Sequence, residues 1–320
     1  MVDVRLPNAL RAAIDNEIGA SRGDAAALSD AYRARRPSSV AVMGEGDVAA
    51  YLTTRLPATF AAIVRVLDEV AGRVGGFAPK SLLDAGAGPG TASWAAVEIF
   101  PELKQVSLLD HNRPLLEMAG RLAMASSSSA LAGARRVLGV LAAPPDERHD
   151  LVIAGYALTE LADSAVVDAA LALWARCDGV LVVVEPGRPR DYQRLMQVRA
   201  ALFAAGAEIA APCPQEGPCP LPADDWCHFS VRLPRSKAHR QAKGGVLGYE
   251  DEKFSYLIVA RPGLAARPTS ARVIRSPIVK KFEVELALCA TDGLEARSVP
   301  KREPAAFKAA KKLDWGDTLD

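Results

Sequence analysis

An apolar strand pattern that runs into a cluster of glycines constrains this chain most. Residues 81–91 read Ser-Leu-Leu-Asp-Ala-Gly-Ala-Gly-Pro-Gly-Thr, with Asp84 two residues before the first glycine. Glycines at alternate positions let the chain turn sharply after a strand, and they let backbone amides approach a ligand because no Cβ stands in the way. A helix that begins near Thr91 then offers unpaired amide donors. The segment therefore predicts a strand, a ligand-binding turn and a helix.

The spacing of the glycines indicates which cofactor the turn binds. It is Gly-x-Gly-x-Gly, whereas the dinucleotide pattern is usually Gly-x-Gly-x-x-Gly, so S-adenosylmethionine is favoured over NAD. The next expected strand, 105–109, is followed by Asp110, where a carboxylate can accept hydrogen bonds from both hydroxyls of a ribose. Both cofactor classes share such an acid, so an NAD-dependent oxidoreductase is the remote alternative. The simpler alternative is a tight turn between strand and helix that binds no ligand.

Composition sets the broad class of protein. The chain has 320 residues, of which 50% are hydrophobic and 24% charged, which suits one large globular domain with an appendage. A net charge of +1 neither demands nor excludes a polyanionic partner. No apolar run is long enough to cross a bilayer, and the first residues are too acidic for an organelle transit sequence. We expect a cytoplasmic protein without a membrane partner, while the oligomeric state is not indicated.

The pattern of hydrophobic residues divides the chain into three parts. Residues 1–78 form a helical region that we expect to be broken at Pro37 and Pro57. Residues 79–262 alternate short apolar runs with helix-like runs, which predicts a doubly wound α/β domain with a parallel sheet covered on both faces. This domain carries a Cys-rich insertion at about 207–228. Residues 263–320 are a small, basic, β-containing extension whose fold is not readable from the pattern.

Within the α/β domain, the expected strands and helices follow one another closely. Two late strands, 229–233 and 253–260, suit an antiparallel hairpin at the edge of the sheet. A possible strand in the extension covers 279–289. The earlier expected strands are 81–85, 105–109, 136–141, 150–154 and 179–185, and the expected helices are 91–100, 113–124 and 191–205.

The cysteines suggest an inorganic centre. Cys213, Cys219 and Cys227 fall within fifteen residues in a Pro- and Gly-rich context, and Cys289 lies far downstream. Four thiolates can hold either a tetrahedral zinc ion or an iron–sulfur cluster. Structural zinc usually takes ligands from pairs separated by two to four residues, which are missing here, and a cysteine followed by proline is familiar beside clusters. The spacing therefore favours [4Fe–4S], with zinc as the alternative and scattered structural thiols as the plainest reading.

Two neighbouring residues have competing interpretations. His228 directly follows Cys227 and is a possible metal ligand, although packing or a supporting hydrogen bond is the commoner role for such a histidine. Cys177 precedes a buried strand pattern and is expected in the core. Nucleophilic catalysis by Cys213 is conceivable only in a base-binding context that the sequence does not provide.

A basic segment follows the Cys-rich loop. Between Val231 and Lys243 the chain carries five Lys or Arg residues and no acid, which makes it a candidate for binding the phosphates of RNA. Aromatic residues are sparse there, so recognition would rest on the phosphate backbone and on shape. A solvated charged face is the alternative. The candidates are Arg232, Arg235, Lys237, Arg240 and Lys243, and the bias continues in the tail from Arg272 to Lys312.

Motifs distributed over nearly the whole chain resemble a known family, namely the bacterial relatives of the methyltransferase-like assembly factor of the mitochondrial small ribosomal subunit. The matching segments are Tyr32-Arg33, Arg55-Leu-Pro-Ala-Thr-Phe60, Leu83-Asp-Ala-Gly-Ala-Gly-Pro-Gly-Thr91, Cys213-Pro, Cys219-Pro-Leu, Asp225-Trp-Cys-His-Phe229, Tyr249-Glu-Asp-Glu-Lys-Phe-Ser-Tyr256 and Trp315-Gly-Asp317. The resemblance implies a class I methyltransferase (Rossmann-like) fold and association with small-subunit rRNA during ribosome assembly and translation.

The resemblance also implies roles for individual residues. A [4Fe–4S] cluster would be held by Cys213, Cys219, Cys227 and Cys289. Asp84 would lie near the amino-acid end of S-adenosylmethionine and Asp110 would hold its ribose. Leu141 and Tyr156 are further candidates for the cofactor pocket. Backbone along the glycine turn would line the cofactor, at Ala85, Gly86, Ala87, Gly88, Pro89 and Gly90.

Catalysis is the part that the sequence leaves open. Residues 155–160, Gly-Tyr-Ala-Leu-Thr-Glu, lack the Asn/Asp-Pro-Pro-Tyr pattern of methyltransferases that act on amino groups. Glu160 and Glu185 lie where a cleft at the strand ends could use them, although acids that stabilise a turn or a helix start are equally expected there. No general base is assigned. Methyl transfer to RNA or to a ribosomal protein and non-catalytic RNA binding are the two competing functions.

Overall fold

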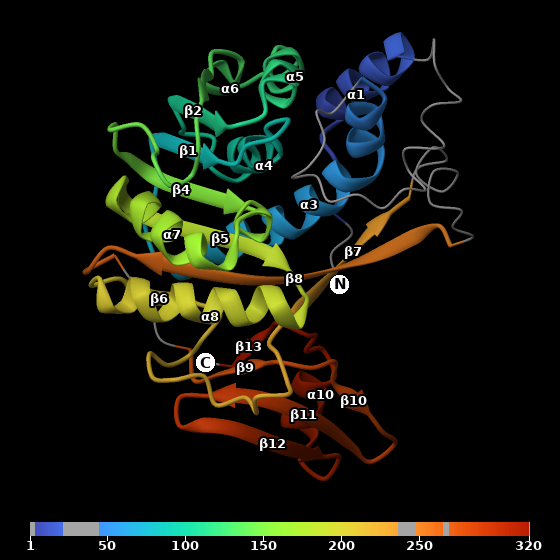
Figure 1. Ribbon diagram of the computed structural model, residues 1–320. Helices are drawn as coiled ribbons and strands as arrows, with labels where there is room; N and C mark the ends of the chain where they lie inside the picture. Colours follow the sequence, from blue (N-terminus) through green and yellow to red (C-terminus); the bar gives the residue numbers. More distant parts are fainter. Residues whose placement is uncertain (1–3, 22–44, 236–246, 265–268, 320) are drawn as a thin grey trace.

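The computed structural model describes residues 4–21, 45–235, 247–264 and 269–319, and this part of the chain contains two β-sheets (Figure 1). The larger sheet has eight strands and the smaller one, built by the C-terminal residues, has five. No helix in the described ranges is long and apolar enough to cross a membrane.

The larger sheet is mostly parallel. Its first five strands lie in the order β3-β2-β1-β4-β5 and run parallel to one another, which is a doubly wound arrangement. With the antiparallel strand that follows β5, this is the class I methyltransferase (Rossmann-like) fold. The strands are β1 (Ser81–Ala85), β2 (Gln105–Asp110), β3 (Arg135–Leu138), β4 (His149–Gly155) and β5 (Cys177–Pro186).

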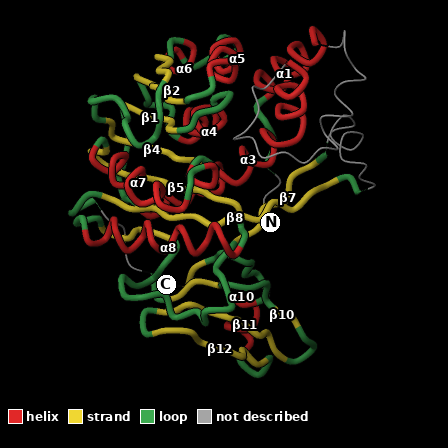
Figure 2. The backbone as a smooth tube through the Cα atoms, in the orientation of Figure 1, coloured by secondary structure: helices red, strands yellow, loops and turns green. Residues whose placement is uncertain are grey.

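Helices cover both faces of this sheet, as the near-continuous apolar runs in its strands require. One face packs against α3, α4, α5 and α6, and the other against α7 and α8 (Figures 1 and 2). Cys177 is fully buried on the second face, so its expected place in the core is confirmed. The helices are α4 (Thr91–Ile99), α5 (Arg113–Ala123), α6 (Ser129–Ala132), α7 (Val166–Ala175) and α8 (Pro189–Ala204), with short 3₁₀ turns η3 (Leu158–Glu160) and η4 (Asp163–Ala165).

The expected late hairpin exists, since strand β7 (Phe229–Pro234) pairs antiparallel with β8 (Tyr249–Ala260). Among the described strands, β7 pairs with β8 alone, whereas β8 also pairs with β5 and β6 (Glu208–Ala211). The second half of β8 lies between β5 and β6. Its run from Phe254 to Ala260 is buried, which is the property of a central strand. Residues 208–211 were expected in the Cys-rich insertion, but they form β6 because the backbone of β8 offers them an unpaired edge.

The N-terminal helices pack directly on the larger sheet. Helix α1 (Asn8–Ser21) contacts α3 (Glu45–Arg73), and α3 crosses the sheet next to α4, β7 and β8 (Figure 1). The expected break at Pro57 is wrong, because α3 continues through this proline. Proline removes one helical hydrogen bond, but the buried side chains on either side, Leu52, Leu56 and Phe60, hold the helix against the core. Pro37 lies outside the described residues.

The C-terminal residues form a small sheet with its own core. Its order is β10-β11-β9-β13, and β12 pairs with the other side of β11. Apolar residues of β11 alternate inward and pack with Phe307 and Ala310 of α10. The expected strand over 279–289 is split into β10 and β11. The elements are β9 (Ala271–Val273), β10 (Ile278–Val279), β11 (Glu283–Ala290), β12 (Gly293–Pro300), α10 (Pro304–Ala310) and β13 (Thr318–Leu319).

Candidate functional site

The glycine turn joins β1 to α4 in a conformation that favours glycine. Gly86, Gly88 and Gly90 all have positive φ, at 75°, 53° and 83°. The amides of Gly86 and Ala87 both donate to the carbonyl of Leu109 at the end of β2, at 2.8 and 3.0 Å. A Cβ on Gly86 would lie 2.4 Å from Cβ of Ala157. The turn is therefore held tightly against the ends of β2 and β4.

Two carboxylates organise the glycine turn. Asp84 is buried and its Oδ2 accepts hydrogen bonds from the amide and hydroxyl of Ser93, at 2.9 and 2.8 Å, so it anchors the first turn of α4. Burial raises the pKa of Asp84 to about 7, while the bonds from Ser93 oppose that shift. Asp110 accepts from the amides of Gly88 and Asn112, each at 2.7 Å. A carboxylate has about four acceptor positions, so Asp110 can still bind further hydroxyl groups.

Helix α3 supplies residues near this turn that the sequence pattern did not assign. The hydroxyl oxygen of Tyr51 lies 3.8 Å from the position that a Cβ on Gly88 would occupy. Burial raises the pKa of Tyr51 to about 12, and the nearby charges of Asp110 and Asp84 add to the increase. Periodicity placed Tyr51 on a helix but could not indicate that this helix would lie over a turn almost forty residues away.

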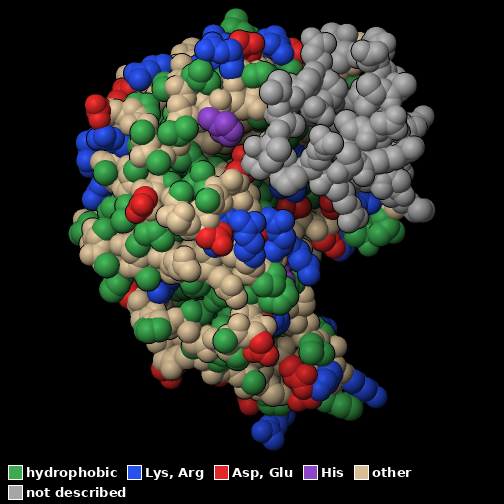
Figure 3. Space-filling view, in the orientation of Figure 1, with side chains coloured by type: hydrophobic (Ala, Val, Ile, Leu, Met, Phe, Trp, Pro, Cys, Tyr) green, Lys and Arg blue, Asp and Glu red, His purple; other side chains and the backbone are tan. Residues whose placement is uncertain are grey.

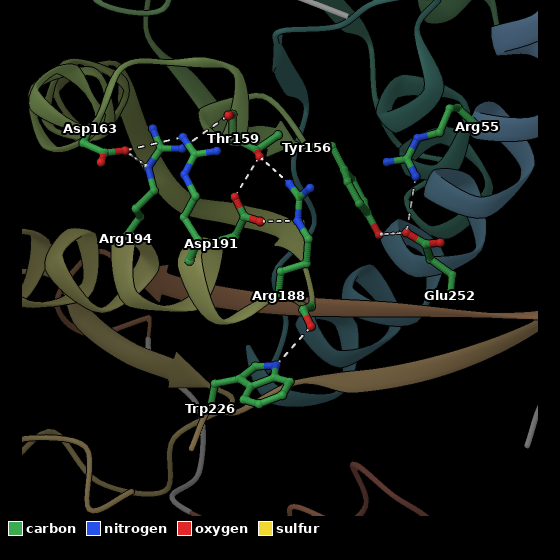
Figure 4. A network of polar contacts seen from close by, with 11 residues as sticks. Arg55, Tyr156, Thr159, Asp163, Arg188, Asp191, Arg194, Trp226 and Glu252 are labelled. Atoms are coloured by element: carbon green, nitrogen blue, oxygen red, sulfur yellow. Dashed lines mark hydrogen bonds and ion pairs between the residues drawn. The ribbon is translucent and has the colours of Figure 1, made fainter. Parts of the chain in front are cut away.

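Tyr156 follows β4 and lies beside the same helix. It is the non-glycine residue with positive φ in the described chain, at 58°, which is a strained conformation for a bulky side chain. Its hydroxyl donates to Oε1 of Glu252 at 3.0 Å, and the guanidinium of Arg55 lies 5.2 Å from the centre of its ring (Figure 4). Leu141 is buried and lies 3.9 Å from the Cβ position of Gly86. The predicted cofactor residues thus gather at one edge of the sheet.

Two acidic residues, Glu185 near the end of β5 and Asp191 in the first turn of α8, hold the turn that follows β4. Oε1 of Glu185 accepts from the amide of Leu158 at 3.0 Å, and burial raises the pKa of Glu185 to about 8. Asp191 has a fully buried side chain, accepts from the hydroxyl of Thr159 at 2.7 Å and pairs with Arg188 at 2.6 Å (Figure 4). These contacts are those of turn-stabilising acids.

A second site lies between α8, the Cys-rich loop and the C-terminal sheet, where Figure 2 shows loop segments in green. Cys213, Cys219, Cys227 and Cys289 all line one cavity, whose empty space, including its open mouth, is about 490 Å³. Three of them come from the loop, and Cys289 comes from β11. The hydroxyl of Tyr192 on α8 bonds to Sγ of Cys219 at 3.0 Å.

The cavity is apolar apart from its thiols and a few polar groups. Among the described residues that line it, Arg272 carries the formal positive charge and no acid is present. Burial raises the pKa of Cys213, Cys227 and Cys289, whereas the guanidinium of Arg272 lowers the pKa of each. Arg199 also lowers the pKa of Cys213 through its charge and a hydrogen bond.

Within the described ranges, no three His, Cys, Asp or Glu side chains lie close enough to hold one metal ion. His228 packs instead, stacked on Trp226 at 5.1 Å between ring centres and edge-on to Trp315 at 4.8 Å. Its Nδ1 lies 3.3 Å from the carbonyl oxygen of Trp226. These contacts fit the packing role that was considered for His228.

The candidate RNA-binding residues fall into two groups. Arg232 forms a bidentate pair with Asp251 at 2.7 and 2.9 Å, and Arg235 pairs with Glu250 at 3.1 Å, both across the β7–β8 hairpin. Lys237, Arg240 and Lys243 lie outside the described residues. The basic bias of the tail is offset in part, since Lys280 and Arg297 pair with nearby glutamates. In the lower part of Figure 3, where the C-terminal sheet lies, acidic and basic side chains are interspersed.

Comparison with known proteins identifies two mitochondrial proteins that are similar to this chain. The chain is 28% identical over 295 residues to the mitochondrial ribosome assembly protein METTL17 of Homo sapiens, a match that covers 86% of this chain and 63% of the human protein. It is 24% identical over 341 aligned residues to the mitochondrial Rsm22-cox11 tandem protein 2 of Schizosaccharomyces pombe, which covers 88% and 44% of the two chains. The chain therefore spans about half to two thirds of the length of these relatives.

Solved structures with similar backbones include the magnesium protoporphyrin IX methyltransferase of Synechocystis PCC 6803 with bound S-adenosylmethionine. Its identity to this chain is 13% and its TM-score is 0.40, with 77% of this chain and 97% of that one covered. The family model described as mitochondrial small ribosomal subunit Rsm22 matches residues 45–320, from the start of α3 to the end of the C-terminal sheet. The chain belongs to the Rsm22 family.

Proposed function

We propose that this chain is a methyltransferase-like protein that binds S-adenosylmethionine at the glycine turn, holds a [4Fe–4S] cluster in the thiol cavity and acts in the assembly of the small ribosomal subunit. The observation that carries the proposal is that Cys289, from the C-terminal sheet, lines the same cavity as the three loop cysteines. The biological role is supported by the similarity to a ribosome assembly protein and by the Rsm22 family, which is described as belonging to the mitochondrial small ribosomal subunit.

The glycine turn has the features that a sulfonium nucleoside requires. It offers positive-φ glycines, a carboxylate with spare acceptor capacity in Asp110, and the N-terminus of α4. The hydroxyl of Thr91 is buried at that N-terminus without a hydrogen-bond partner among the described residues. A buried hydroxyl normally has a partner, so the hydrogen bonding at this helix start is incomplete among the described residues.

A calorimetric titration tests the cofactor. Asp110→Asn should weaken binding of S-adenosylmethionine about 10- to 100-fold, because hydrogen bonds to a charged acceptor contribute roughly 1.5–3 kcal/mol. The matched control is Asp146→Asn, since Asp146 is exposed and precedes β4 at the opposite edge of the sheet. Wild-type protein that binds neither S-adenosylmethionine nor its demethylated product would refute the site.

The thiol cavity suits a cluster better than one metal ion. Structural zinc is usually held by cysteine pairs separated by two to four residues, and this sequence has no such pair. A cluster distributes its ligands over four iron atoms and so takes cysteines that stand further apart. When bound, it would supply ligand bonds that add directly to folding stability. Cys213, Cys219 and Cys227 would hold it from the loop and Cys289 from β11.

Contact with rRNA is proposed through the basic segment beyond β7. Arg232 and Arg235 are paired with acids, so the charge available for phosphates would come mainly from Lys237, Arg240 and Lys243. Reversing these three charges to Glu should weaken binding to small-subunit rRNA and reduce its salt dependence, whereas Arg232→Gln should change both much less. If the wild type and the triple variant bind rRNA with equal affinity and equal salt dependence, the segment is a solvated charged surface and does not bind rRNA.

Methyl transfer is tested separately from binding. Holo protein is incubated with methyl-labelled S-adenosylmethionine and immature small subunits, and the label is located. Label on a single rRNA nucleotide or on one ribosomal protein would establish an enzyme, with catalysis by placing the acceptor in line with the sulfonium. Stable binding to the subunits without label would establish an assembly factor that uses the fold as a scaffold.

A further inference from the structure

Besides the four cysteines, one buried charged side chain among the described residues lines the thiol cavity, and its positive charge could compensate a negative centre bound there. Arg272 of β9 is 1% exposed and lines this cavity. A guanidinium is charged at all ordinary pH values and is expensive to bury without compensation. Its position inside the protein therefore calls for a negative partner, and Glu69 supplies one from outside the cavity.

The contacts of Arg272 join three parts of the chain. Nε donates to the carbonyl of Pro212 at 2.6 Å, and the two terminal nitrogens donate to the carbonyl of Gly316 at 2.7 Å and to Glu69 of α3 at 2.5 Å. Pro212 directly precedes Cys213, so one of these bonds fixes the start of the ligand loop. A guanidinium has five N–H groups and these acceptors take three, which leaves donors for sulfur.

In the Arg272–Glu69 ion pair, the positive charge lies nearer the thiol cavity than the negative charge. Glu69 does not line the thiol cavity, while Arg272 does, so the positive member of the pair stands on the cavity side. Four thiolates around an oxidised [4Fe–4S] core carry a net charge of about −2, and one-electron reduction makes it more negative. Burying that charge is costly without a nearby cation, and charge near a cluster is one of the factors that set its potential.

We propose that Arg272 is a positioning residue of the sulfur centre, which offsets the negative charge of the centre, makes its one-electron reduction easier and ties the ligand loop to α3 and the C-terminal sheet. This inference rests on the proposed cluster. The reduction itself adds one electron from an external one-electron donor to the iron core, and no bond is formed or broken in it. Glu69 acts in the opposite direction, because its negative charge partly cancels that of Arg272.

An electrochemical titration of anaerobically purified protein, followed by electron paramagnetic resonance, tests this role. Arg272→Gln should lower the midpoint potential by at least 59 mV, which is a tenfold change in the equilibrium constant of a one-electron couple. Arg272→Lys keeps the charge and should stay near wild type, even though it loses hydrogen bonds. Glu69→Gln should shift the potential upward. This reversal of sign is something that a purely structural role would not produce.

Arg261→Gln is the matched control. Arg261 also donates to two backbone carbonyls and stacks on an aromatic ring, that of Trp174 at 3.8 Å, but it does not line the cavity. Its substitution should leave the potential unchanged. If Arg272→Gln does not fold, Arg199→Gln replaces it, because Arg199 is buried, interacts with Cys213 through its charge and a hydrogen bond, and also donates to the carbonyl of Gln215. It should lower the potential in the same direction.

Three results would overturn the inference. An unchanged potential in Arg272→Gln or, where that variant does not fold, in Arg199→Gln, with wild-type iron content, would remove the electrostatic role. Equal shifts in Arg272→Lys and Arg272→Gln would show that geometry rather than charge matters. Wild-type protein without a cluster has no potential to measure, so that result refutes the iron–sulfur proposal itself, together with the role of Arg272.

Discussion

Gly86 illustrates how a single residue meets two requirements at once. Its φ of 75° disfavours any residue with a side chain, and a Cβ there would approach Cβ of Ala157 to 2.4 Å. The sequence predicted the first requirement from the spacing of the glycines. It could not predict the second, because Ala157 belongs to a strand end seventy residues away that meets the turn only in the folded sheet.

Gly86→Ala should therefore reduce the free energy of unfolding by about 2 kcal/mol or more, as both backbone strain and a clash contribute. It should also weaken S-adenosylmethionine binding. Gly72→Ala is the control, since Gly72 lies in the last turn of α3 with open space around its Cβ position and should gain up to about 1 kcal/mol. Chemical denaturation measures both. Equal effects of the two substitutions would contradict the account of the turn.

Glu185 predicts a pH dependence of stability. Burial and the charge of Asp191 raise its pKa to about 8, whereas an unfolded glutamate titrates near roughly 4.3. Between these values the folded state holds a proton that the unfolded state has released, so the free energy of unfolding falls as pH rises, by up to about 1.4 kcal/mol per pH unit. Glu185→Gln removes this contribution. Denaturation from pH 5 to 8 should show a shallower decline in the variant, and identical slopes would refute the assignment.

At the scale of elements, helix α3 is where prediction from the sequence was least complete. Apolar periodicity indicated helices around Val48–Leu56 and Phe60–Val74, but intrinsic propensity placed a break at Pro57 that tertiary packing overrides. One helix consequently reaches from Tyr51 at the glycine turn to Glu69 beside Arg272. The α/β core was more predictable, because strand and helix periods alternate in it without such a conflict.

The arginines of β7 form ion pairs across the β7–β8 hairpin. Counting basic residues along the sequence could not show these pairs, so the segment was interpreted as a basic surface. Arg232 and Asp251 face each other across the strands with side chains 44% and 38% exposed, while Arg235 and Glu250 are 16% and 14% exposed. Double-mutant cycles should give a coupling below about 1 kcal/mol for the exposed pair and a larger one for the shielded pair. A larger coupling for Arg232–Asp251 would contradict this ranking.

At the scale of the whole molecule, the two sheets are joined around the thiol cavity. Arg272 reaches the loop and α3, Arg275 pairs with Asp225 at 2.5 Å, and Cys289 faces the loop cysteines. The spacing of the three loop cysteines suggested an inorganic centre, but the contribution of Cys289 followed only from the resemblance to a family. No local pattern can show that a strand sixty residues downstream returns to the same cavity.

The most direct test of the account measures iron and acid-labile sulfide in anaerobically purified wild-type protein, Cys289→Ser and Cys177→Ala. Wild type and Cys177→Ala should contain about four iron atoms and four sulfides per chain, because Cys177 lies in the core away from the cavity. Cys289→Ser should lose them and unfold at lower temperature, since a bound centre adds to folding stability. A wild-type protein that contains zinc and no iron, or a full cluster in Cys289→Ser, would contradict the account.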